Sequence, residues 1–81
     1  MNISKIEIEL IKGNQIEFIY NNKTYRIYQG EVCEQDDVFV LIDSNNKTYE
    51  KYFFKDLLKV KVNNATLKEM LEDSDKIKIV Y

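Results

Sequence analysis

The chain of 81 residues offers few side chains that could carry out catalysis. It contains no histidine and a single cysteine, Cys33, which stands among acidic residues. Because histidine is absent, the sequence lacks the usual general base at neutral pH, and it lacks Ser–His and Cys–His nucleophile pairs. Neighbouring carboxylates would also disfavour the reactive thiolate form of Cys33. We therefore expect a protein that is not an enzyme.

Carboxylate pairs are the remaining candidates for general acid–base chemistry. Asp36 and Asp37 are adjacent, and a second acidic group lies near the C-terminus, at Glu69, Glu72, Asp73 and Asp75. The pair is expected in a polar connection, and the second group on the polar face of a helix end. We interpret both as solvated surface.

The sequence contains few residues that could form a metal or cofactor site. A structural zinc site is built from several cysteine and histidine ligands, and this chain has one cysteine and no histidine. A phosphate-binding loop needs closely spaced glycines, whereas Gly13 and Gly30 are the only two glycines. The sequence predicts no metal and no cofactor.

Composition indicates one folded domain over residues 1–81. Apolar residues make up 44% of the chain and aromatic residues 12%, which is typical of a globular protein rather than a disordered one. Apolar runs such as VFVLI are far shorter than the ~20 residues needed to span a bilayer, and the N-terminus lacks the pattern of a signal peptide. A lone cysteine cannot form an internal disulfide. We expect a soluble, cytoplasmic protein without a membrane partner.

Charge is segregated along the chain although the net charge is only −2. Residues 31–46 contain five acidic and no basic residues, whereas residues 47–61 contain five lysines and two acidic residues. The acidic segment could dock on a basic protein surface through Glu31, Glu34, Asp36 and Asp37. The basic segment could contact phosphate through Lys47, Lys51, Lys55 and Lys59, although a pI of about 5.1 disfavours a nucleic-acid binder. Alternatively, these charges only solvate the surface and protect sheet edges.

The first residues carry signals of both a strand and a helix. KIEIEL alternates apolar and charged residues, as a strand does. However, Ser4 and Glu7 match a capping box, and Gly13 stands where a helix C-cap is expected. We therefore predict a helix over residues 5–12. Its buried face would be formed by Ile6 and Leu10.

The segment QIEFIYNNKTYRIYQ is predicted to be a β-hairpin with a two-residue turn at Asn21 and Asn22. With this turn every cross-strand pair is chemically matched, namely Ile16 with Ile27, Glu17 with Arg26 and Phe18 with Tyr25. A three-residue turn would place Phe18 opposite Arg26 and expose half of the apolar residues. Asparagine suits the shorter turn because it tolerates positive φ better than any residue except glycine.

Similar signals predict the remaining elements. A polar connection is expected over residues 30–37, a third strand over 38–42, and its partner strand after a reversal at DSNNK. FKDLLK indicates a short helix, Thr66 and Glu69 form a capping box that opens a further helix, and KIKIVY alternates as a strand. The predicted fold is α+β in the order α-β-β-β-β-α-α-β. It is an antiparallel sheet of four to five strands with two or three short helices packed on one face.

The sheet face opposite the helices is a second candidate surface for a partner. The hairpin register places Ile19 and Tyr28 on it, and one of Tyr49 and Tyr52 is expected to join them, with Tyr52 chosen as the candidate. Tyrosine is common at interfaces because it combines a large rigid contact with a hydroxyl group. A homodimer through this face, or through the terminal edge strand, would be its simplest form.

The pentapeptide NNKTY occurs twice, and six of the eight asparagines form three pairs. The pairs are Asn21–Asn22, Asn45–Asn46 and Asn63–Asn64, and each lies where a chain reversal is expected. Outside the pentapeptide the two copies agree only loosely. We interpret the repeat as turn chemistry rather than as a duplicated functional element.

The stretches IELIKGNQIEFIYNNKTYRI and FFKDLLKVKVNNATLKEML resemble short uncharacterised α+β proteins of low-GC Gram-positive bacteria, their phages and mobile elements. Those proteins combine a helix, an IEF-x-Y-NG-K-x-Y hairpin and a late LL…DG-x-(S/T)-L-x-E element, and the match covers most of this chain. Asn22 and Asn64 stand here where glycine is usual. The resemblance implies a setting in which small acidic proteins include anti-CRISPR-like inhibitors of host defence.

The leading hypothesis is a small non-enzymatic protein-binding module, such as an anti-defence inhibitor that occludes a host protein. The acidic segment, together with Ile19, Tyr28 and Tyr52, would form its contact surface. One alternative is a nucleic-acid-associated protein that uses the strip from Lys47 to Lys59. Another is a small-ligand sponge formed at a homodimer interface.

Overall fold

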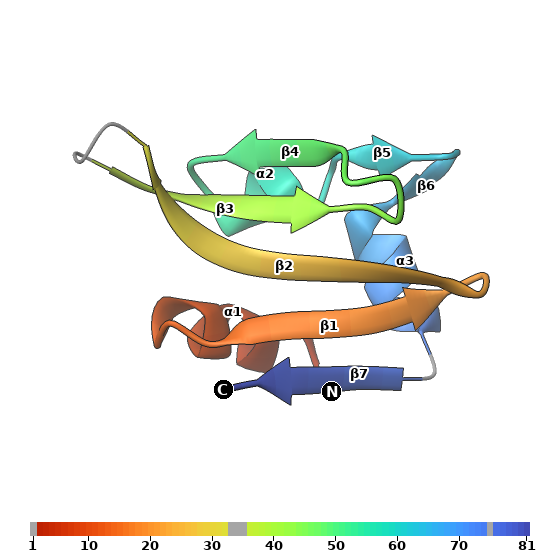
Figure 1. Cartoon of the computed structure of the whole chain (residues 1–81), viewed down its shortest axis with the longest axis horizontal. Helices are drawn as coiled ribbons and strands as arrows, with labels where there is room; N and C mark the ends of the chain where they lie inside the picture. Colours follow the sequence, from red (N-terminus) through yellow and green to blue (C-terminus); the bar gives the residue numbers. More distant parts are fainter. Residues whose placement is uncertain (1, 33–35, 75) are drawn as a thin grey trace.

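The computed structural model describes residues 2–32, 36–74 and 76–81. These residues form three α-helices and seven β-strands, in the order α1 (Ile3–Ile11), β1 (Gln15–Tyr20), β2 (Lys23–Val32), β3 (Asp36–Ile42), β4 (Thr48–Lys51), α2 (Phe54–Leu57), β5 (Lys61–Val62), β6 (Ala65–Thr66), α3 (Leu67–Asp73) and β7 (Lys76–Val80). Five strands form one antiparallel sheet in the order β4-β3-β2-β1-β7, and β5 and β6 form a separate pair (Figure 1). The predicted α+β class and element order are confirmed, with β5 and β6 as additional strands.

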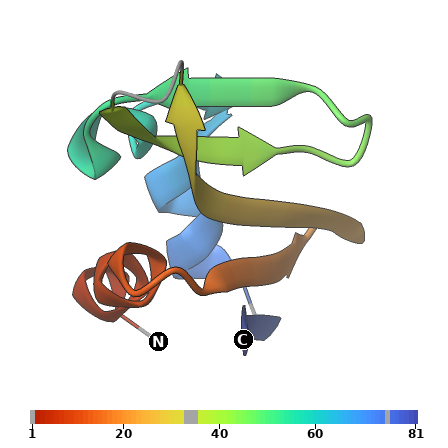
Figure 2. The same ribbon diagram turned by 60° about the vertical axis from the view of Figure 1, so that its left-hand side comes forward.

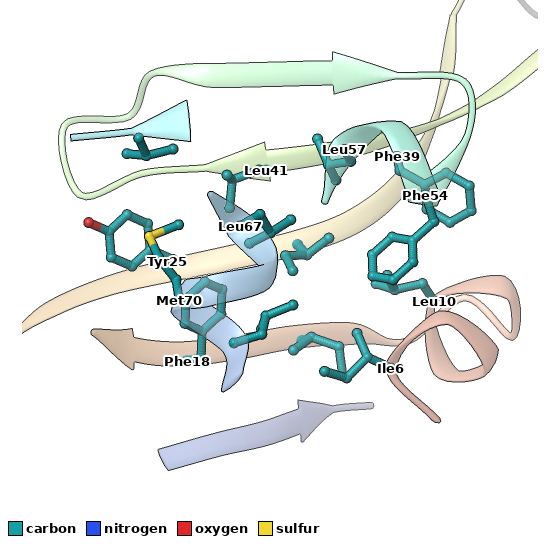
Figure 3. Close-up of a cluster of buried hydrophobic side chains, with 14 of the residues drawn as sticks. Ile6, Leu10, Phe18, Tyr25, Phe39, Leu41, Phe54, Leu57, Leu67 and Met70 are labelled. Atoms are coloured by element: carbon teal, nitrogen blue, oxygen red, sulfur yellow. The ribbon is translucent and has the colours of Figure 1, made fainter. Parts of the chain in front are cut away.

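The hydrophobic core lies between the five-stranded sheet and the helices, which lie behind the sheet in Figure 1. Side chains of successive strand residues point to opposite faces, so alternate residues of the three middle strands face the core, namely Ile16, Phe18, Tyr25, Ile27, Phe39 and Leu41. The helices contribute the facing layer, which includes Ile6, Leu10, Phe54, Leu57, Leu67 and Met70 (Figure 3). The other sheet face carries no helix among the described residues and is called the outer face below.

Helix α1 is confirmed, but it begins two residues earlier than predicted. Its N-cap is Asn2, whose side-chain Oδ1 accepts a hydrogen bond from the backbone N–H of Lys5 at 2.9 Å. The earlier start allows Ile3 to pack against the core, whereas Ser4 lies inside the first turn instead of capping it. Gly13 ends the helix with φ of +94°, as its sequence position predicted.

The hairpin of β1 and β2 has the predicted two-residue turn and the predicted register. Ile16 pairs with Ile27, Glu17 with Arg26 and Phe18 with Tyr25. Asn21 and Asn22 both have positive φ, at 51° and 63°, which suits the tight turn that matches the twist of the strands. The rings of Phe18 and Tyr25 stack with centroids 5.2 Å apart.

Residues 30–37 are not the polar connection that was predicted. β2 continues through Gly30 to Val32, β3 begins at Asp36, and Glu31 lies opposite Asp37 in the ladder. The prediction was wrong because Asp, Glu and Gly have low strand propensity, whereas an antiparallel backbone ladder continues regardless of side-chain polarity. Residues 33–35 lie outside the described part of the chain. β2 bends along its length, as Figure 2 shows.

All three asparagine pairs lie at chain reversals, as predicted, but the turns differ. Between β3 and β4, the Asp43 side chain accepts backbone hydrogen bonds from Asn45 and Lys47, and only Asn46 of that pair has positive φ. At the third pair, between β5 and β6, both residues have positive φ, as in the first hairpin. The repeated NNKTY therefore supports two different turn geometries.

The chain ends with the helix α3 and the strand β7. Thr66 and Glu69 form the predicted reciprocal capping box of α3, with the Thr66 Oγ1 accepting from the Glu69 N–H at 3.2 Å. β7 then pairs with β1, so that Ile77 lies opposite Phe18 at the edge of the sheet. This pairing closes one side of the core and makes β7 an edge strand.

Candidate functional site

The acidic candidates lie at the far end of the β2–β3 hairpin. Glu31 belongs to β2, and Asp36 and Asp37 belong to β3, where the ladder sets Glu31 opposite Asp37. Glu34 lies outside the described residues. The backbone thus brings three of the four acidic candidates to one end of the sheet.

The outer-face candidates differ in their exposure. Ile19 is 41% exposed on β1, whereas Tyr28 on β2 is only partly exposed. The reason is Gly30, two residues further along the strand: a Cβ atom at this glycine would lie 3.2 Å from the Tyr28 ring. The ring therefore occupies the space above Gly30 and lies beside Val40, its partner in β3, which is only 3% exposed. The Tyr28 ring therefore lies against the sheet, and only part of it is free to contact a partner.

The segment that joins β4 to α2 carries two adjacent aromatic residues that are exposed to solvent. Tyr52 is 60% exposed and Phe53 is 62% exposed, whereas the next residue, Phe54, is 2% exposed. Phe53 is the N-cap residue of α2 with an extended backbone, and the helix that starts at Phe54 turns this second ring inward against Phe39, at 5.5 Å between centroids. Tyr49 packs partly against the core. Of the two tyrosines considered, Tyr52 is thus the more accessible one.

A hollow of about 300 Å³ lies beside Phe53, between α1 and α2. Apolar side chains make up most of its walls, and Glu7 and Lys55 supply one charge of each sign. The lining residues are Ile3, Ser4, Glu7, Phe39, Phe53, Phe54, Lys55 and Leu58. We refer to Tyr52, Phe53 and this hollow together as the aromatic surface.

The four lysine candidates Lys47, Lys51, Lys55 and Lys59 are exposed, and two of them lie over aromatic rings. The Lys47 ammonium lies 5.1 Å from the centroid of Tyr49, and that of Lys55 lies 5.6 Å from the centroid of Phe53. Lys51 directly precedes Tyr52 in the chain, and Lys59 follows α2. Lys51 and Lys55 therefore flank the aromatic pair along the chain, whereas Glu7 brings a negative charge to the wall of the hollow.

An ion network crosses three strands of the outer face. Arg26 Nη2 donates to Glu17 Oε2 at 3.1 Å, and Lys78 Nζ lies 3.4 Å from the other oxygen of the same carboxylate. The hydrogen bond from Arg26, reinforced by Lys78, lowers the pKa of Glu17 below its ordinary value. This network ties β7, β1 and β2 together.

Two further pKa shifts are resolved among the described residues. Burial raises the pKa of the Tyr25 hydroxyl above its ordinary value of 10.0, and the charge of Asp43 adds to this rise. Backbone and side-chain hydrogen bonds from Thr66 lower the pKa of Glu69. Each shift is explained by a contact that stabilises the fold.

Three of the carboxylates considered for acid–base chemistry belong to α3. Glu69 is held in the capping box, Glu72 and Asp73 are exposed on α3, and Asp75 lies outside the described residues. Within residues 2–32, 36–74 and 76–81, no group of three or more potential metal-binding side chains comes together. In the same described part, no helix is both long and apolar enough to cross a membrane.

Sequence reasoning named Tyr52 as a candidate on the outer sheet face, but β4 ends at Lys51 and Tyr52 follows the strand. It missed the exposure of Phe53 and the hollow beside that residue. The signal was present in the run YFF, because side chains of an extended segment alternate in direction, so the three rings could not all face one core. The hollow could not be found in this way, since its walls come from α1, β3 and α2.

Comparison of the chain with models of known protein families, with curated proteins and with solved structures finds no match.

Proposed function

We propose that the protein is a non-catalytic protein-binding module that contacts its partner through the aromatic surface. The observation that carries this proposal is the exposure of two aromatic residues adjacent in the chain, Tyr52 and Phe53, of which Phe53 lines an apolar hollow. Aromatic residues are enriched at the centres of protein interfaces, where their burial supplies much of the binding free energy. Aromatic rings that remain in water add little to the stability of the fold. A partner that covers these rings would explain why they are present at the surface.

The charges around the aromatic surface suggest the chemistry of the partner. Lys51 and Lys55 border the exposed rings. The aromatic surface would therefore match a partner surface on which acidic side chains surround an apolar side chain. At about 300 Å³, the hollow is at the lower end of the range of roughly 300–1,000 Å³ for ligand pockets. That size suits one apolar side chain of a protein partner.

In the cell, such a module would be an inhibitor that occludes a host protein. It would catalyse no reaction itself. This form of the proposal rests on the resemblance of the sequence to small proteins of phages and mobile elements. The acidic residues Glu31, Glu34, Asp36 and Asp37 would supply a second contact, to a basic surface. Reversing Glu34, Asp36 and Asp37 to lysine should then weaken capture of the partner.

An affinity capture from a lysate of the source organism tests the aromatic surface. The bait proteins would be the wild type, the double variant Tyr52→Ser/Phe53→Ser, and the control Ile8→Ser/Ile11→Ser, which removes two similarly exposed apolar side chains from α1. We expect the wild type and the control to retain the same partner and the aromatic variant to lose it. Equal retention by all three proteins would contradict the proposal.

A single-stranded nucleic acid is the second candidate partner, favoured by the position of Lys55 over Phe53. Proteins that bind single strands stack bases on exposed aromatic rings and neutralise phosphates with neighbouring cations. In this case, labelled oligonucleotides would bind at low salt, with an affinity that falls steeply as salt is added. No binding at low salt would remove this candidate and leave the protein-binding proposal untouched.

A further inference from the structure

The far edge of β7 is open in the part of the chain that the structure describes. β7 is the last strand in the sheet order and pairs with β1 alone among the described strands. Figure 1 shows no other element on that side of it. An unpaired strand edge presents a row of backbone N–H and C=O groups that can pair with another chain.

The two faces of β7 differ sharply in character. Ile77 and Ile79 are partly buried against the core, whereas Lys76 and Lys78 are exposed on the outer face. Each face also borders a hollow. On the core side, a hollow of about 370 Å³ is lined by Asn2, Ile3, Leu71, Glu72, Ser74 and Ile77. On the outer side, one of about 400 Å³ is lined by Glu17, Phe18, Ile19, Lys76, Ile77 and Lys78.

From this arrangement we propose that the β7 edge binds an extended acidic segment of a protein partner by strand addition. The added strand would carry acidic side chains at alternate positions, next to Lys76 and Lys78, and apolar side chains between them. The apolar side chains would point to the core side, towards the hollow beside Ile77. Main-chain hydrogen bonds would supply affinity, and the alternating side chains would supply specificity.

Charge decides between this occupant and a second copy of the chain. Two β7 edges placed side by side would bring their lysines together, and like charges on neighbouring strands are destabilising. Glu17 offsets one positive charge, but it is already shared by Arg26 and Lys78. Asp73 lines a hollow together with Lys76. The basic residues Arg26, Lys76 and Lys78 still outnumber Glu17 and Asp73, so the outer side of the edge repels a second copy of itself and attracts an acidic strand.

This inference goes beyond the proposed function because it concerns a different surface. Ile3 lines both the hollow beside Phe53 and the hollow beside Ile77, so the two surfaces meet at the first turn of α1. The groups that would carry binding are nevertheless separate, with Tyr52 and Phe53 on one surface and the β7 backbone and its lysines on the other. Each surface can thus be altered without the other.

The test uses three labelled seven-residue peptides, one alternating Asp and Val, one with the same composition in two blocks, and one alternating Lys and Val. We expect the wild type to bind the alternating acidic peptide at least about tenfold more tightly than the other two, a difference of about 1.4 kcal/mol. Binding should also slow the hydrogen exchange of β7 amides. Equal affinity for the alternating and block peptides, or unchanged β7 exchange, would overturn the proposal.

Charge reversal supplies the matched control. Lys76→Glu/Lys78→Glu should lose the acidic peptide and gain the Lys–Val peptide. Because Lys78→Glu also places a like charge beside Glu17, the single variant Lys76→Glu provides a second measurement in a folded protein, with the same direction of change. Unaltered selectivity in Lys76→Glu would contradict the proposal. Tyr52→Ser/Phe53→Ser should bind the acidic peptide as the wild type does, whatever the outcome of the affinity capture.

A second copy at this edge is the competing occupant. If a second copy occupies this edge, light scattering of the peptide-free protein would show a dimer, and hydrogen exchange would show protected β7 amides. That result would overturn the assignment to an acidic strand. A monomer with exchanging β7 edge amides is the expected result.

Discussion

The ammonium group of Lys55 lies 5.6 Å from the centroid of the Phe53 ring, which remains 62% exposed, whereas the neighbouring ring of Phe54 is buried against Phe39. Two adjacent phenylalanines therefore have opposite roles. One holds α2 on the sheet, and the other lies at the surface under a cation. A cation placed over an exposed ring contributes about 0.5–1 kcal/mol at most such sites, which is far less than burial of the ring in a core.

The first prediction concerns this pair of phenylalanines. Phe54→Ala should lower the free energy of unfolding by about 3–5 kcal/mol, because it leaves a cavity in the core. Phe53→Ser should not lower it, because the lost ring is mostly in water and serine is a better N-cap residue than phenylalanine. Urea unfolding of both variants measures the difference. A large loss of stability in Phe53→Ser would show that its ring is a core residue and not part of a docking surface.

The second prediction concerns the turn between β1 and β2. Asn22 has φ of 63°, so Asn22→Ala should destabilise the fold by about 1 kcal/mol, the cost of a left-handed conformation for a residue with an ordinary side chain. Asn22→Gly should raise stability slightly, because glycine is preferred at this turn position. Asn45→Ala is the control, since Asn45 is not among the residues with positive φ. Equal losses at positions 22 and 45 would contradict this account of the repeat.

The third prediction concerns the capping box of α3. Thr66→Ala removes the oxygen that accepts from the Glu69 N–H, and this loss should cost about 1 kcal/mol of stability. Thr66→Ser keeps the oxygen and should retain most of that stability. Thermal or urea unfolding of the two variants distinguishes a cap from a simple packing role, in which serine and alanine would cost about the same.

The fourth prediction concerns stability at alkaline pH. The pKa of Tyr25 is raised above 10.0 by burial, which means that the folded state favours the neutral hydroxyl group. Its contribution to stability is therefore fully present below pH 10.0 and is lost as the pH rises through the raised pKa of the folded state. Tyr25→Phe cannot ionise, so its unfolding free energy should fall less between neutral and alkaline pH than that of the wild type. Parallel pH dependences would contradict the burial argument.

Local pairing and capping could be predicted from the sequence with good accuracy. The register of the first hairpin was confirmed because only one turn length matches Phe18 with Tyr25 and also Glu17 with Arg26. The start of α1 was predicted two residues too late from the capping box at Ser4. Asn2 is also a good N-cap residue, and packing of Ile3 against the core favours the earlier start. Contacts within a few residues of each other are thus accessible to sequence reasoning.

Features that depend on distant segments could not be predicted in the same way. Tyr28 was expected to be free on the outer face, but its ring lies over Gly30 and beside Val40, and this arrangement depends on β2 continuing past residue 30. The pairing of β7 with β1 joins the two ends of the chain and is not specified by alternation alone. The hollow beside Phe53 requires that residues of α1, β3 and α2 come together.

Site-specific photo-cross-linking tests the central claim most directly. A photoreactive phenylalanine analogue would replace either Tyr52, on the aromatic surface, or Ile11, on α1, since both side chains are 60% exposed. After irradiation in a lysate of the source organism, the account predicts a covalent adduct of one defined mass from position 52 and none of that mass from position 11. The same adducts from both positions, or no adduct from position 52, would contradict the claim that the aromatic surface is where a protein partner binds.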